Sequence, residues 1–133
     1  MWYSTVEGGY ITLVSVLIIG AIGITITLSL ILLGIESSRT TFSADQSHQG
    51  RALVNACTEE ALELIRTTTS FTGSGNLALP QGSCSYTVAN QGAENRVVNA
   101  SGSVGTNVRK VKVIISKINP TIQIVSWQEV ADF

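Results

Sequence analysis

Residues whose chemistry could support catalysis are few in this 133-residue chain. His48 is the only histidine, and it lies in a polar stretch with Asp45, where no Ser/His/Asp or Cys/His arrangement accompanies it. Glu59 and Glu60 are adjacent, so on a helix they point to different faces and do not form a carboxylate pair. We therefore expect His48 on a solvated helix face, and we expect no enzyme and no cofactor.

Two cysteines, Cys57 and Cys84, form the one pair of thiol-bearing side chains. They show no CxxC motif and no clustered histidines that would suggest a metal site. The two could remain thiols or could pair in a disulfide. A disulfide would close a loop of about 26 residues, worth roughly 3.5 kcal/mol on the chain-entropy model. We expect the bridged form, which requires an oxidising compartment.

A long apolar segment must position everything that follows it. From Gly8 to Ile35 there is no Asp, Glu, Lys, Arg or His. Residues 10–35 reach about 39 Å as a helix, more than the roughly 30 Å of a bilayer's hydrocarbon. The segment is too long for the core of a secretory signal peptide, and Met1 to Gly9 contains no Lys or Arg. We expect a retained, membrane-spanning anchor.

The residues before the apolar run are Glu7-Gly8-Gly9-Tyr10-Ile11-Thr12-Leu13. A short polar leader that ends in Gly, followed by an aromatic residue and a long apolar helix, resembles the processing site of type IV prepilins. The resemblance implies that prepilin peptidase cuts between Gly9 and Tyr10 on the cytoplasmic side and then methylates the new N-terminus, at Tyr10. It also implies that the apolar helix is kept and packs against other pilin subunits.

One position departs from the pattern of that family. Most members carry Glu as the fifth residue of the mature chain, where it offsets the N-terminal amine of a neighbouring subunit. Here that position is Val14. An ion pair lost in a water-poor setting is costly. Members that lack this Glu include subunits thought to lie at a filament tip, so the resemblance implies a minor pilin or pseudopilin.

After the membrane segment the pattern becomes amphipathic and then strand-like. Apolar residues recur at spacings of three and four at Leu53, Cys57, Ala61, Leu64 and Ile65, which predicts that the helix continues to Thr69. Turn chemistry fills residues 70–82, and four strand-like runs follow at 84–89, 96–103, 108–118 and 121–127, with Gly92, Gly102, Gly105 and Asn119-Pro120 between them. The expected fold is α+β, a long helix packed on a small antiparallel sheet.

The charges argue about topology and partners. The nearest charges flanking the apolar run are Glu7 before it and Glu36 and Arg39 after it, so the positive-inside rule weakly favours a cytoplasmic head. The cysteine pair favours the opposite, oxidising side, which we prefer. Arg109, Lys110 and Lys112 form the one basic cluster, which we interpret as the solvated face of a strand. DNA contact is the alternative, but near-zero net charge gives little reason to expect nucleic acid as a partner.

These patterns predict a leader at 1–9, a membrane-spanning or filament-core helix at 10–35, an amphipathic helix at 36–69 and a sheet head at 70–133. The expected function is that of a tip or assembly-priming subunit of a type IV pilus-like or secretion-type filament, supporting assembly, adhesion or uptake. It would span the inner membrane once, with its head extracytoplasmic, before it enters an extracellular filament. The alternative is a stand-alone membrane-anchored binding domain that does not polymerise.

Overall fold

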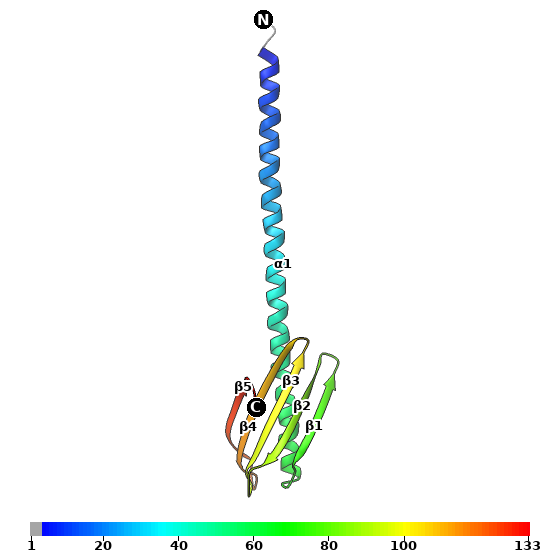
Figure 1. The fold of residues 1–133 in the computed structure, drawn as a ribbon, viewed down its shortest axis with the longest axis vertical. Helices are drawn as coiled ribbons and strands as arrows, with labels where there is room; N and C mark the ends of the chain where they lie inside the picture. Colours follow the sequence, from blue (N-terminus) through cyan, green and yellow to red (C-terminus); the bar gives the residue numbers. More distant parts are fainter. Residues whose placement is uncertain (1–3) are drawn as a thin grey trace. The chain divides into compact units, whose positions relative to one another are not determined.

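The computed structural model describes residues 4–133, with one helix followed by five strands (Figure 1). Helix α1 spans Ser4–Thr67. The chain divides into two compact units, of which the first ends at Phe42 and the second runs from Ser43 to Phe133. The first unit is helical throughout its described part, and the second, here called the head, holds the rest of α1 and all five strands.

The strands form one open sheet in the order β1-β2-β3-β4-β5, in which each strand pairs antiparallel with its neighbour. This confirms the predicted α+β fold with a helix on an antiparallel sheet. The bounds are β1 Gly73–Leu79, β2 Gly82–Asn90, β3 Arg96–Val104, β4 Asn107–Lys117 and β5 Gln123–Val130.

One strand was wrongly predicted as turn, because β1 consists of Gly73-Ser-Gly-Asn-Leu-Ala-Leu79. Two glycines and an asparagine normally disfavour a strand. Here Gly75 stands opposite Tyr86 in the register, and a Cβ at Gly75 would collide with the Tyr86 ring. The missing side chain therefore makes room for a buried aromatic residue of the next strand, which the sequence pattern of β1 alone does not reveal.

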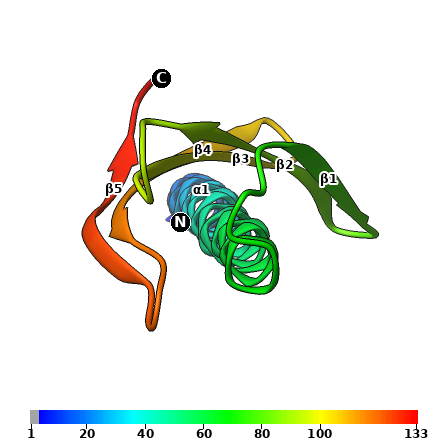
Figure 2. The ribbon, with the colours of Figure 1, turned by 90° about the horizontal axis from the view of Figure 1, so that it is seen from below.

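The core lies between one face of α1 and the concave face of the sheet, which curves around the helix (Figure 2). The predicted apolar stripe is confirmed at four of its five positions, since Leu64 is only half-buried. Alternate residues of β2, β3 and β4 point to the helix, as the two-residue period of a strand requires. The buried helix residues are Leu53, Val54, Cys57, Thr58, Ala61 and Ile65, and the strands add Cys84, Tyr86, Val88, Val98, Ala100, Val104, Val111, Val113 and Ile115.

Gly102 allows the closest approach between helix and sheet. We predicted it as a break between strands, which is wrong, because it lies inside β3 with its Cα facing α1. A Cβ added there would lie 3.0 Å from the backbone nitrogen of Val54 and 3.2 Å from the carbonyl oxygen of Gly50. Gly105, by contrast, is at the β3–β4 turn with a φ of 58°, as the turn prediction required.

Candidate processing site and polar contacts of the head

The Gly9–Tyr10 peptide bond lies within α1, and both residues are exposed. The hydroxyl of Thr12 donates a hydrogen bond to the Gly9 carbonyl oxygen at 2.9 Å, so a peptidase that needs an extended substrate must first release this turn of helix. A Cβ at Gly9 would meet no atom within 4 Å. A side chain at Gly9 is therefore compatible with the fold of this chain, and only a recognising enzyme would reject it.

The part of α1 that follows this bond is long and apolar enough to cross a membrane. The candidate span begins at Gly9, and its most apolar window has a mean hydropathy of 2.7, with none of that window buried within the chain. Its polar residues are short and bonded to their own helix: Ser15, Thr25, Thr27 and Ser29 each donate a hydrogen bond to a carbonyl oxygen one turn earlier. These bonds satisfy the hydroxyl donors in an apolar surrounding.

The two cysteines are joined, as predicted. Cys57 on α1 and Cys84 on β2 form a disulfide, with their Cα atoms 6.2 Å apart and a sequence separation of 27. Both residues are buried in the core. The bond therefore links the helix covalently to the sheet, across the interface that holds the head together.

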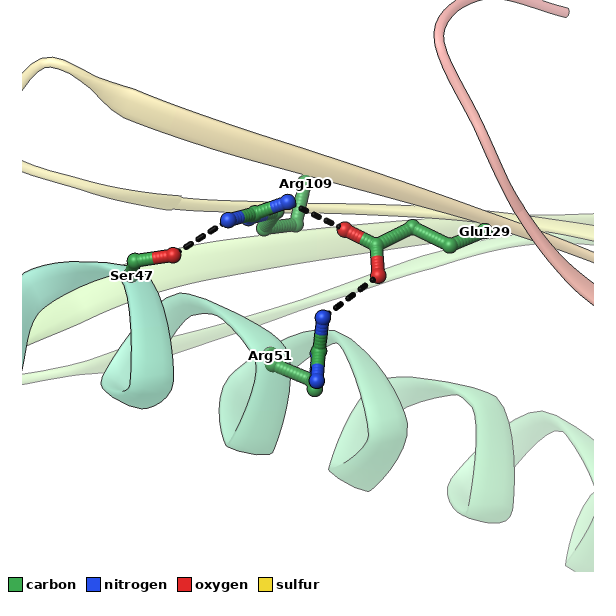
Figure 3. Close-up of polar contacts among 4 residues, drawn as sticks. All are labelled: Ser47, Arg51, Arg109 and Glu129. Carbon is green, nitrogen blue, oxygen red and sulfur yellow. Dashed lines mark hydrogen bonds and ion pairs between the residues drawn. The ribbon is translucent and has the colours of Figure 1, made fainter. Parts of the chain in front are cut away.

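A polar cluster joins α1, β4 and β5 at one side of the head (Figure 3). The Glu129 carboxylate accepts from Arg109 Nη1 at 2.6 Å and from Arg51 Nη2 at 3.2 Å, and Arg109 Nη2 also donates to the hydroxyl of Ser47. The interpretation of Arg109 as part of a solvated strand face is wrong. It has the same parity as Val111, so its side chain lies on the helix side of the sheet.

A second polar cluster organises the loops around the C-terminal end of α1. The guanidinium of buried Arg96 donates to four oxygen atoms, belonging to Thr69, Asn90, Ala93 and Asn95, at 2.8–3.0 Å. Its Nε has no hydrogen-bond partner among the described residues. This one side chain thus ties the β2–β3 loop to the segment that leaves the helix.

A nearby carboxylate fixes the loop that follows β4. Glu94 accepts hydrogen bonds from the backbone N–H groups of Ile118 and Asn119, at 3.0 and 3.4 Å. The bond from Ile118 is the main reason that the pKa of this carboxyl lies below its ordinary value, and the positive charges of Lys117 and Arg96 contribute. The sequence pattern did not single out Arg96 or Glu94, because their partners are mostly backbone atoms of distant loops.

The remaining residues considered for chemistry lie apart. His48, Glu59 and Glu60 are exposed on α1. Burial raises the pKa of the Tyr86 hydroxyl, and the negative charge of Glu60 adds to that rise. Within residues 4–133 that the structure describes, no three His, Cys, Asp or Glu side chains are grouped so as to hold a metal ion. The expectation that the chain is not an enzyme stays a prediction.

Comparison of the chain with protein-family models, with curated proteins and with solved structures finds no match to any of them.

Proposed function

We propose that this chain is a minor subunit of a type IV pilus-like or secretion-type filament, placed at the tip or needed to start assembly. The observation that carries the proposal is the Gly9–Tyr10 junction at the start of an apolar helix that continues into a disulfide-linked sheet head. Prepilin peptidase would cut after Gly9 and methylate Tyr10. The chain would first span the inner membrane with its head outside the cytoplasm, and would then enter an extracellular filament to support assembly, adhesion or uptake.

The minor rather than the major role follows from Val14. In a core of stacked helices each buried N-terminal amine needs a nearby carboxylate, and the next acid after Val14 is Glu36. Glu36 lies about 33 Å further along the helix, too far to substitute. A homopolymer would bury one uncompensated amine per subunit, at a cost of several kcal/mol each. The chain should therefore be rare in a filament built mostly from another pilin that keeps its Glu.

The processing step is tested by replacing Gly9. Gly9→Leu should leave the leader attached, because the peptidase requires Gly before the cut. Gly23→Leu is the matched control, since Gly23 is an equally open glycine of the same helix, and this variant should still be cut. Gly9→Leu protein that starts at Tyr10 would overturn the proposal, and an uncut wild-type chain would favour the stand-alone membrane-anchored binding domain.

The position in the filament is tested by restoring the acid. Val14→Glu should raise the amount of this chain along the filament shaft, because the new carboxylate can offset a neighbour's amine. Val16→Glu adds the same charge two residues further along the helix, at a position without that role, and should not raise it. Purified filaments made mostly of the wild-type chain would contradict the minor role.

A further inference from the structure

The exposed apolar side chains of the head gather at one edge of the sheet. From Ser43 to Phe133, all of which the structure describes, the large apolar residues with high exposure are Leu79, Val108, Ile114, Ile124, Val125, Trp127 and Phe133. All except Leu79 belong to β4, to β5 or to the residues after β5. Contiguous exposed apolar groups of this kind mark protein–protein contact surfaces more often than single scattered ones do.

Strand β5 carries the centre of this surface. It is the last strand of the sheet and pairs with β4 on one side. All eight of its residues are exposed or half-buried. Its other side presents backbone N–H and C=O groups along an open edge, which is the arrangement that accepts a further strand.

The apolar layer of the core continues onto β5 without being covered there. Trp127 stands opposite Val113 in the register, and Ile124 stands opposite Ile115. Val113 and Ile115 are fully buried at 0% exposure, whereas Trp127 is 40% and Ile124 is 43% exposed. The sheet thus extends one strand beyond the part that α1 covers, and aromatic residues such as Trp127 are typical anchors of interfaces.

The charges of β5 fit an uncharged partner. From Gln123 to Gln128 the strand has no charged residue, and so lacks the lysines that commonly prevent edge-to-edge pairing. Its one acid, Glu129, is already bonded to Arg51 and Arg109 within the head. The register shift near Ile115 leaves Val125 without a partner on β4 and bends the strand there, so the regular edge available for pairing is Ser126–Val130.

We propose that β5 accepts an extended, uncharged strand from another protein, which pairs along Ser126–Val130 and covers Trp127. A strand is the partner that matches this surface, because it alone satisfies a row of alternating backbone donors and acceptors while placing apolar side chains over Trp127 and Ile124. That the partner is another subunit of the filament rests on the proposed function.

Photo-crosslinking in the cells that naturally produce the full-length chain tests this inference. Benzoylphenylalanine is placed singly at Ser126 and Gln128, which share the outer face of β5, and at Thr87 in the middle of the sheet as the control. The expected result is adducts from positions 126 and 128 that map to one segment of one protein, at residues two apart, with at least tenfold less adduct from position 87.

A blocking variant completes the test. Ser126→Lys should reduce the adduct from position 128 at least tenfold, whereas Thr87→Lys should leave it unchanged. Retention of the Cys57–Cys84 disulfide in each variant checks that the head is folded. Adducts to lipid alone, to a helix or to scattered proteins, equal yields at Thr87, or no adduct from β5 would each overturn the inference. Cleavage after Gly9 is read from the same protein, so a failed filament role and a failed strand contact are distinguished.

Discussion

Breaking the disulfide between Cys57 and Cys84 should destabilise the head strongly. The bond closes a loop with a sequence separation of 27. The chain-entropy relation gives about 3.5 kcal/mol at 25 °C for a loop of this length. For a domain of about this size, that loss lowers the melting temperature by roughly 20 °C. Because both cysteines are buried, alanine is the better replacement, since serine would add unsatisfied hydroxyl groups to the core.

The assay is denaturant unfolding of the full-length chain in detergent micelles, followed by the fluorescence of Trp127. Oxidised wild type is compared with reduced wild type, which keeps both sulfur atoms and so isolates the cross-link. The double variant Cys57→Ala, Cys84→Ala should lose at least as much stability as reduction does, and should no longer respond to reductant. Equal midpoints for oxidised and reduced wild type, or free alkylation of both thiols in the native protein, would refute the reasoning and would also remove the argument for an oxidising compartment.

Three further changes probe the head. Arg96→Met should cost about 3 kcal/mol in a denaturant melt, because it leaves several carbonyl oxygens of the loops without a donor; wild-type stability would contradict the tying role. Gly102→Val should displace the sheet from α1 at Val54 and lower the melting temperature by more than Gly92→Val, whose site is open but has a positive φ. Since the folded-state pKa of Glu94 is lowered, its contribution to stability is present above its unfolded value and is lost as pH falls through the folded value. Glu94→Gln should therefore flatten the acid limb of a stability–pH curve, and an unchanged limb would refute this.

The elements with strong periodicity were predictable from the sequence. The apolar run and the three- and four-residue spacing after it predicted α1, which ends at Thr67 rather than Thr69, an ordinary uncertainty of a helix end. Alternation through Tyr86 and Val88, and through Val111, Val113 and Ile115, predicted the buried faces of β2 and β4. These patterns succeed because one face of each element is covered by a single partner.

The failures arise where a residue's role is set by a distant part of the chain. Glycine at positions 75 and 102 suggests a turn, yet each makes room for a neighbour, Tyr86 and the α1 backbone respectively. Arg109 was grouped with two lysines by charge, although its parity with Val111 already placed it on the helix side. The disulfide was predictable as a pair, but its position across the helix–sheet interface required the register of β2.

The most direct test of the account is the intact mass of the chain purified from the membranes of its own cells. The account predicts a mass that corresponds to residues 10–133 with one added methyl group and two fewer hydrogens for the Cys57–Cys84 bond. A chain that keeps Met1 and the residues up to Gly9 would contradict processing as a pilin-like subunit.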